Sequence, residues 1–259
     1  MLFRSLLKAG QSVATIDLDS PQRSLTHHVE NRRAWAKRVG RNLEIPEHVG
    51  LDCSPAGDQA EACKAFADAV ERLAQTCSFI VIDTAGHGSD LMRLAHSAAD
   101  TLITPLNDSF VDFDVLGTVD PETFSVSGTS HYSEMIDEVR RQRRLAGLGP
   151  IDWVVLRNRL SMLGTRNKRL VGAALQELAG KLEFRAIEGL AERMIFREFY
   201  PRGLTALDDL DETTLGTRPT MSHATARQEV ASLLQSISLV SNRTPMAPGE
   251  AAAHDRDAA

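Results

Sequence analysis

Long apolar runs are missing from this chain of 259 residues. Its longest apolar stretches are far too short to cross a bilayer, and its start carries no full signal peptide. Cysteine is also scarce, because Cys53, Cys63 and Cys77 have neither metal-ligand nor CxxC spacing. An odd, scattered set of this kind is typical of reduced thiols, so we expect a cytoplasmic protein with no membrane partner.

Positive charge is in short supply, with 29 Lys and Arg against 35 Asp and Glu and a formal net charge of −6. Any binding to nucleic acid would therefore depend on a local basic patch. The remaining composition, 42% hydrophobic and 25% charged, is ordinary for a soluble globular protein. The length suits one large α/β domain or two small ones.

The most informative stretch is FIVIDTAGHG at residues 79–88, where four apolar residues run directly into Asp83 and a glycine-containing turn. The pattern predicts a strand buried on both faces of a parallel sheet, with its acid at the end where open α/β sheets bind ligands. A carboxylate there can hold Mg²⁺, usually through water, and the turn can contact a terminal phosphate. In the alternative reading, Asp83 only caps the next helix.

Similar patterns recur along the chain. Further strands are predicted at residues 13–19, 100–105, 152–156 and, more weakly, 183–187. Helices are predicted at residues 1–10, 58–77, 89–98, 132–146, 165–181 and 223–238. This alternation predicts an α/β fold, a doubly wound and mainly parallel sheet with helices on both faces, as a single domain over residues 1–239. Residues 240–259, rich in Ala, Pro and charge, are expected to be a disordered tail.

Four phrases in a fixed order resemble a known family: VATIDLD, FIVIDTAGHG, DTLITPLNDSFVDFDVLGTVDP and DWVVLRNRL. They are similar to the MipZ branch of the ParA/MinD ATPases, deviant Walker proteins that position bacterial division and segregation machinery. The resemblance implies a P-loop NTPase fold, ATP and Mg²⁺ as cofactors, and an ATP-gated homodimer. The acid-ended strands alone would also suit a receiver domain phosphorylated on Asp83, which the length and a missing strand-end lysine disfavour.

The resemblance also implies roles for residues at the strand ends. Asp19 matches the catalytic acid of the first switch and could orient the attacking water, with Asp17 as its neighbour. Asp83 matches the Walker B acid that holds hydrated Mg²⁺, and Thr84 and Gly86 match the second switch, in which Ala replaces the usual Pro. For Asp17 the favoured alternative is a structural cap.

At the end of a later strand, Asn158 resembles the residue that hydrogen-bonds the adenine. The alternative for Asn158 is a turn residue after a strand.

The family's glycine-rich phosphate loop, KGGAGKS/T, has no counterpart in this sequence, which contains neither GKS nor GKT. By resemblance, residues 1–10 correspond to the second half of the helix after that loop, and the absent strand would lie beside the Asp83 strand in the middle of the sheet. Without the loop the phosphates lose backbone amides and lysines, so we expect this polypeptide not to hydrolyse ATP as it stands. Truncation is the favoured explanation, and a nucleotide-free module that binds DNA or protein is the alternative.

A local basic cluster does occur in this acidic chain. By the resemblance, the expected partners are non-specific DNA at the nucleoid, a ParB-type protein and FtsZ. The predicted DNA-binding residues are Arg166, Lys168 and Arg169, in a basic stretch that also holds Arg157 and Arg159, and Arg193, which with Arg197 lies on another predicted short helix that extends the surface. Arg166 and Arg169 fall one helical turn apart and share a face, and phosphate contacts of this sort give affinity without sequence reading. A solvated helix face is the alternative.

Overall fold

The computed structural model describes residues 1–19, 22–53, 57–86, 89–161 and 166–239. Two of its sheets are parallel and three-stranded, in the orders β2-β1-β3 and β4-β7-β8, and the third is an antiparallel pair, β5-β6. The strands are β1 (Val13–Asp17), β2 (Glu47–Gly50), β3 (Phe79–Asp83), β4 (Thr101–Asn107), β5 (Gly117–Val119), β6 (Val126–Thr129), β7 (Asp152–Asn158) and β8 (Arg185–Ile187). The predicted α/β class is confirmed, with its parallel strands divided between two sheets. The tail expected at residues 240–259 lies outside the described residues.

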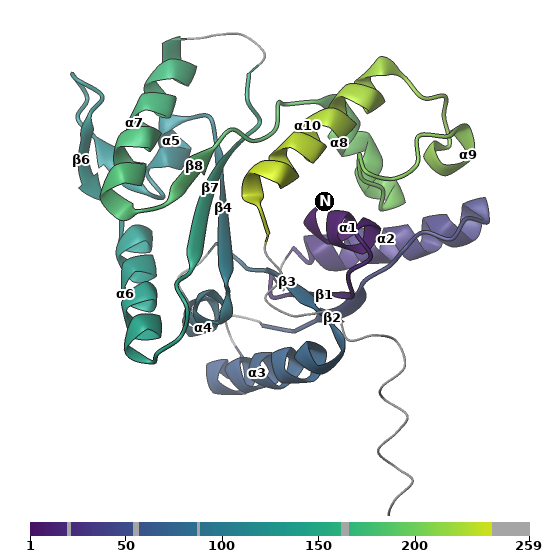
Figure 1. Ribbon diagram of the computed structural model, residues 1–259, viewed down its shortest axis with the longest axis horizontal. Helices are drawn as coiled ribbons and strands as arrows, with labels where there is room; N and C mark the ends of the chain where they lie inside the picture. Colours follow the sequence, from purple (N-terminus) through teal and green to yellow (C-terminus); the bar gives the residue numbers. More distant parts are fainter. Residues whose placement is uncertain (20–21, 54–56, 87–88, 162–165, 240–259) are drawn as a thin grey trace, which may run out of the picture.

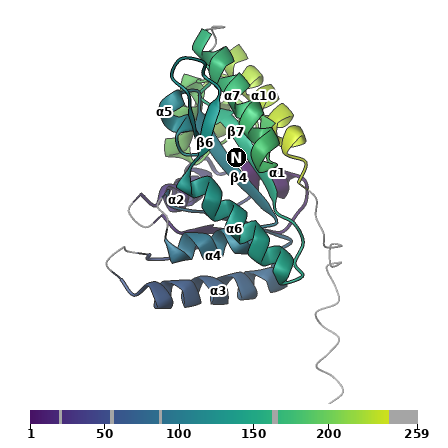
Figure 2. The ribbon, with the colours of Figure 1, turned by 90° about the vertical axis from the view of Figure 1, so that its left-hand side faces the viewer.

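Helices cover both faces of each parallel sheet (Figure 1, Figure 2). Helices α1 (Leu2–Lys8) and α2 (Ser24–Val39) lie on one face of the first sheet, and α3 (Gln59–Thr76) and α4 (Asp90–Ala98) lie on the other. Helices α6 (His131–Leu145) and α7 (Arg166–Leu182) flank the second sheet on the side opposite α10 (Met221–Ile237). The short helices are α5 (Phe110–Phe113), α8 (Met194–Phe199), η1 (Tyr200–Arg202) and α9 (Glu212–Leu215).

The strand at the centre of each sheet has the most apolar surroundings. Every residue of β1 is buried, and so are the five central residues of β7. In register, Asp17 of β1 stands beside Asp83 of β3, and Asn158 of β7 stands beside Asn107 of β4. Because parallel strands paired in register end together, polar side chains collect at the carboxyl edge of each sheet, where α/β folds bind ligands.

Alternation along the strands sends side chains into separate cores. Ala14 and Ile16 of β1 pack with the α3 residues Phe66 and Leu73, whereas Val13 packs with Phe3 of α1. Helix α4 contributes to two cores, since its Leu91 and Ala95 pack under the first sheet and its Met92 packs in the core of the second. This helix therefore holds the two sheets together.

A buried ion cluster ties the beginning of the chain to its later part. Arg4 of α1 donates from Nε to Asp208 Oδ1 at 2.8 Å, and Arg32 of α2 donates to both oxygens of the same carboxylate at 2.7 and 2.9 Å. Lys8 reaches the carbonyl oxygen of Leu207 at 3.2 Å. These contacts fix α1 and α2 against the segment between η1 and α9. None of the helices in the described part of the chain combines the length and apolar character that a bilayer crossing requires.

Candidate functional site

Three carboxylates gather at the carboxyl edge of the first sheet. Asp17 and Asp83 end neighbouring strands as register partners, and Asp19 follows two residues after Asp17. Burial raises the pKa of Asp83, and the negative charges of Asp17 and Asp19 raise it further. A hydrogen bond from Ser24 Oγ to Asp83 Oδ2 at 3.4 Å acts in the opposite sense. Like charges crowded on one edge favour a bound cation, so this arrangement suits a metal ion.

Within this group, Asp17 is engaged by the protein itself. Its side chain is 2% exposed, and its Oδ2 accepts hydrogen bonds from the backbone N and the Oγ1 of Thr26, both at 2.8 Å. Its Oδ1 accepts a bond from the backbone N of Asp19 at 3.0 Å. Asp17 therefore orders the loop that carries Asp19 and the first turn of α2, and the cofactor contact expected for it stays a prediction. Sequence reasoning missed Thr26, which no spacing pattern links to Asp17.

Asp19 and Asp83 keep more access to solvent than Asp17. Both are partly exposed, as is Thr84, and Gly86 is exposed with open space around its α-carbon. Among the described residues no group of three or more His, Cys, Asp and Glu side chains has a metal-binding arrangement. A cation at this edge would therefore be held by one or two carboxylates and water, which is the coordination that Mg²⁺ accepts.

Asn158, the residue expected to contact adenine, belongs to the second sheet. It ends β7, is partly exposed, and stands beside Asn107, whose Nδ2 donates to Asp112 Oδ1 at 3.2 Å. Chain connectivity relates this edge to the acid cluster, because α4 returns the chain from the end of β3 to the start of β4. The two polar edges therefore belong to separate sheets that α4 joins.

The basic stretch is only partly a surface feature. Arg166 and Arg169 are exposed near the start of α7, and Lys168 between them is partly exposed. Arg157, in contrast, is 7% exposed, forms an ion pair with Asp108 and donates to the carbonyl oxygen of Lys168 at 2.8 Å. Including Arg157 in the surface patch was therefore wrong, because it serves the packing of α7 on β7.

The loops before α7 and α8 lie side by side. A parallel bridge joins Leu160 to Ala191, with hydrogen bonds of 3.0 Å from Leu160 N to Leu190 O and from Glu192 N to Leu160 O. The bridge brings the exposed Arg159 toward the start of α8. Nothing in the sequence pattern indicated this pairing.

At the start of α8, Arg193 is occupied by an ion pair. Its Nε and Nη2 donate to both carboxylate oxygens of Glu229 at 3.0 and 2.5 Å, and this hydrogen bonding raises the pKa of Arg193. Its predicted contact with DNA stays a prediction, and that contact would have to compete with Glu229.

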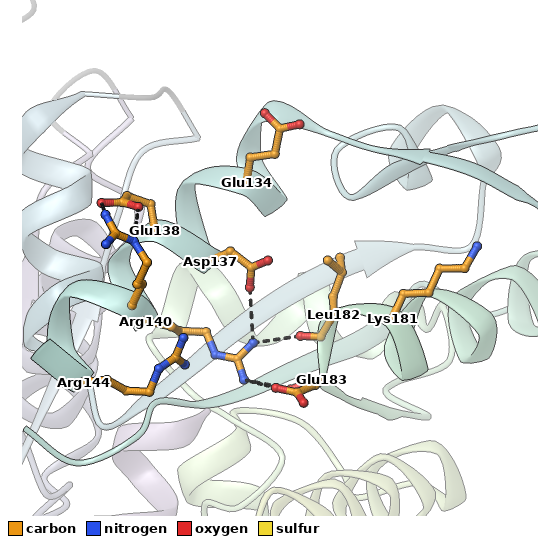
Figure 3. A pocket seen from close by; sticks show the side chains of 9 residues that line it. Glu134, Asp137, Glu138, Arg140, Arg144, Lys181, Leu182 and Glu183 are labelled. Carbon is orange, nitrogen blue, oxygen red and sulfur yellow. Dashed lines mark hydrogen bonds and ion pairs between the residues drawn. The ribbon is translucent and has the colours of Figure 1, made fainter.

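A groove away from these edges is lined by α6 and by the connection from α7 to β8, at the amino-terminal end of the second sheet (Figure 3). Arg140 donates to the carbonyl oxygen of Leu182 at 2.8 Å and lies 3.5 Å from Asp137 and 3.6 Å from Glu183. The acidic and basic side chains of this groove therefore neutralise one another, and the groove contains none of the predicted site residues. We therefore place the candidate site at the carboxyl edges.

Several solved structures resemble this one over most of their length. Apo McdA from Cyanthece is 16% identical with a TM-score of 0.52, over 87% of this chain and 91% of that chain. The MinC:MinD cell division complex of Aquifex aeolicus is 14% identical with a TM-score of 0.49, over 95% and 90%. A putative plasmid partition protein of Borrelia burgdorferi bound to AMPPNP is also 14% identical with a TM-score of 0.49, over 88% and 90%. At these identities the likeness concerns the fold alone.

The sequence itself gives a closer match. Residues 2–241 fit the family described as ATPase MipZ, and this span includes both polar strand edges and the start of α7. The chain therefore belongs to the MipZ ATPase family.

Proposed function

We propose that this chain works in an ATP-gated positioning switch of the MipZ kind. In this switch the nucleotide state controls dimerisation of the chain, binding to nucleoid DNA and to a ParB-type protein, and inhibition of FtsZ assembly. Membership of an ATPase family supports the nucleotide part of the proposal. The observation that carries the proposal is the acid cluster, in which burial and two neighbouring carboxylates raise the pKa of Asp83.

Each residue of the acid cluster and of the turn after β3 would have a separate role in phosphoryl transfer. Asp83 would hold hydrated Mg²⁺, which neutralises phosphate charge when bound, and Asp19 would orient the attacking water. Thr84 and Gly86 would contact the terminal phosphate, because the backbone there is open enough for close approach. Asp17 supports Asp19 through the hydrogen bond to its backbone N.

Binding of the nucleotide would draw on both polar edges. Asn158 would hydrogen-bond the adenine at the edge of the second sheet. The printed sequence contains neither GKS nor GKT, so these residues offer Mg²⁺ and base contacts but no glycine-rich phosphate cradle.

The exposure of the basic residues at the start of α7 favours a second function, DNA binding that does not depend on nucleotide. Arg166 and Arg169 are exposed on α7, and Arg159 lies on the nearby bridged loop. Guanidinium groups spaced in this way bind phosphates without reading sequence. Dependence on ATP therefore separates the switch from a simple DNA-binding module.

Fluorescence anisotropy of labelled duplex DNA tests both functions. Arg166→Ala with Arg169→Ala should weaken binding and reduce the slope of log K against log salt by about 2, because each phosphate contact contributes roughly 0.9. The matched control is Arg141→Ala with Arg144→Ala, which removes the same charge from exposed positions on α6. If both pairs of substitutions behave alike, the DNA surface on α7 is refuted.

The same titration with Mg²⁺ and ATP decides between the two functions. Tighter DNA binding with Mg²⁺ and ATP, lost in Asp83→Asn, supports the switch. Equal binding with and without nucleotide contradicts the switch and supports the module.

A further inference from the structure

The imidazole ring of His48 lies two hydrogen bonds away from Asp17 of the acid cluster. His48 belongs to β2 and is the register partner of Thr15 on β1. Its Nδ1 lies 2.8 Å from Thr15 Oγ1, and its Nε2 lies 3.0 Å from the Oγ1 of Thr26 in the first turn of α2. His48 therefore connects the middle of β1 to the start of α2, beside the acidic edge of the first sheet.

The carboxylate of Asp17 fixes the direction of these hydrogen bonds. A carboxylate only accepts, so Thr26 Oγ1 donates its hydrogen to Asp17 Oδ2 at 2.8 Å. Thr26 Oγ1 must then accept from His48, which places the ring hydrogen on Nε2. Nδ1 is left as the acceptor for the hydrogen of Thr15 Oγ1, whose contact with the carbonyl oxygen of Glu47 is longer, at 3.4 Å. The hydrogen bonds therefore form one directed chain that ends at Asp17.

The surroundings of His48 favour the neutral ring that this chain requires. Burial lowers the pKa of His48, and the positive charges of Arg33 and Arg23 lower it further, whereas the negative charges of Asp17 and Glu30 act in the opposite sense. These charges face the ring from β1, from α2 and from the residue before α2. A neutral imidazole has one donor and one acceptor, which match the two threonine hydroxyls.

Gly50 leaves room for the bond between His48 and Thr26. It ends β2 and stands beside Asp17 in the register of β1 and β2. A Cβ atom at Gly50 would lie 3.1 Å from Thr26 Oγ1 and 3.9 Å from His48 Nε2. A larger residue here would therefore press on the hydroxyl that contacts Asp17.

The bond from His48 decides where the Thr26 hydroxyl points. A threonine in a helix often turns its hydrogen to the carbonyl oxygen four residues earlier. Because His48 Nε2 donates to Thr26 Oγ1, the remaining hydrogen of this hydroxyl is directed to Asp17. The Oγ1 and the backbone N of Thr26 then hold Asp17 Oδ2 together, and Asp17 Oδ1 accepts the bond from the backbone N of Asp19 at 3.0 Å. The position of Asp19 therefore depends on the hydroxyl that His48 orients.

We propose that His48 is a positioning residue for Asp19, and that it acts through Thr26 and Asp17. It fixes the direction of the hydrogen bonds that hold the Asp17 carboxylate, and this carboxylate holds the backbone of Asp19 at the acidic edge. The inference rests on the proposed function for the role of Asp19 in orienting the attacking water. The contacts that carry it, and the test below, involve no nucleotide.

Amide hydrogen exchange at Asp19, followed by NMR, measures how firmly Asp17 holds it. In His48→Asn the amide is too short to reach Thr26 from the position of Nε2, so exchange at Asp19 should become about fivefold faster, the effect of weakening one hydrogen bond. His48→Gln carries an amide donor close to the position of Nε2 and should restore most of the protection. The matched control is His27→Asn on the exposed face of α2, which should leave exchange at Asp19 unchanged.

A double-mutant cycle shows whether His48 acts through Thr26. Thr26→Val keeps the shape of the side chain without its hydroxyl and should also speed exchange at Asp19. Adding His48→Asn to Thr26→Val should then change nothing more, because the hydroxyl that His48 orients is already gone. Additive effects of the two substitutions overturn the proposal.

Two further readouts separate positioning from a general effect on stability. Nitrogen-15 NMR of the wild type at neutral pH should show the His48 ring with its hydrogen on Nε2, and a hydrogen on Nδ1 overturns the proposal. Amides of β7 report unfolding of the distant sheet and should exchange at the wild-type rate in every variant. If His48→Asn speeds exchange at Asp19 and in β7 equally, or if His48→Gln restores nothing, His48 only stabilises the fold and the proposal is wrong. These outcomes decide the role of His48 whether or not the chain binds Mg²⁺ and ATP.

Discussion

At the scale of the residue, Asp208 carries the most constrained charge in the described chain. It is 1% exposed and accepts hydrogen bonds from Arg32, Arg4 and the backbone N of Thr205. Burial alone would raise the pKa of Asp208, but hydrogen bonds from Arg32 and Arg4 and the positive charge of Arg32 hold it at about 2. Since Arg32 is fully buried, neither partner can lose the other without leaving an isolated charge.

Asp208→Asn should lower the free energy of unfolding by about 3–5 kcal/mol at neutral pH, because it leaves Arg32 buried without its countercharge. A carboxyl group with a depressed pKa stabilises the fold above its unfolded pKa, near 3.8, and loses that contribution as the pH falls toward about 2. Urea unfolding across this range should show a loss in the wild type that the variant lacks. The control is Asp209→Asn at the exposed neighbouring position, and equal effects of the two substitutions would contradict the role of Asp208.

Asp83→Asn should have the opposite effect on stability. The pKa of Asp83 is raised by burial and by Asp17 and Asp19, so ionisation of this carboxyl costs stability as the pH rises through its titration range. We expect the variant to be more stable by up to about 1 kcal/mol at neutral pH, with no gain at pH values where Asp83 is protonated. Urea midpoints at the two pH values measure this, and a variant that is less stable at neutral pH would show that Asp83 serves the fold and not a ligand.

At the scale of the element, apolar patterns predicted the strands and helices that form the cores. The runs that became β1 and β7 are buried on both faces, whereas every residue of β3 and most of β4 stay partly exposed, so the burial predicted for residues 79–82 was wrong. Apolar spacing indicated α3 and α7 almost to their ends. The missed elements lack that signal, since β2 and the β5–β6 hairpin are short and partly polar. Helix α2 was missed because its buried residues include Thr26 and Arg32, whose partners are fixed by the tertiary fold.

The candidate site was predictable to a similar extent. The strand-end positions of Asp17 and Asp83 follow from the apolar runs before them, so their meeting at one edge was expected. The burial of Arg157 was not, because its partner Asp108 lies 49 residues away and no local pattern links them. Sequence reasoning therefore located the acidic edge of the first sheet but misjudged part of the basic stretch.

The N-cap of helix α3 tests whether a capping residue next to the helix stabilises the fold. Asp58 caps its first turn, and its side chain accepts a hydrogen bond from Ala60 N at 2.9 Å. Asp58→Ala should cost about 1 kcal/mol of unfolding free energy, as expected for loss of an N-cap. Asp68→Ala on the exposed face of the same helix is the control and should change stability by less than about 0.5 kcal/mol. Equal losses in urea unfolding would show that charge, and not capping, matters here.

At the scale of the whole molecule, the division of the parallel strands between two sheets should affect the free energies of local unfolding. Without hydrogen bonds between β3 and β4, each sheet has its own core and can unfold as a separate unit. Native-state hydrogen exchange in low denaturant should therefore give different opening free energies for amides of β1 and β7.

Truncations in α4 sharpen this prediction, because Leu91 and Met92 serve different cores. Leu91→Ala should weaken mainly the first sheet and Met92→Ala mainly the second, each by about 2–5 kcal/mol. If both substitutions lower the opening free energies of β1 and β7 equally, the molecule is a single cooperative unit.

The anchoring of α1 bears on how this protein is made. Arg4 and its buried partner Asp208 are separated by 204 residues, and Leu239 packs into the same cluster as Phe3. At ribosomal speeds of about 5–20 residues per second, roughly 10–40 s pass between the emergence of Arg4 and that of Asp208. During this interval Arg4 stays without its buried partner Asp208 on the nascent chain, so the ion cluster is among the last parts of the fold to form.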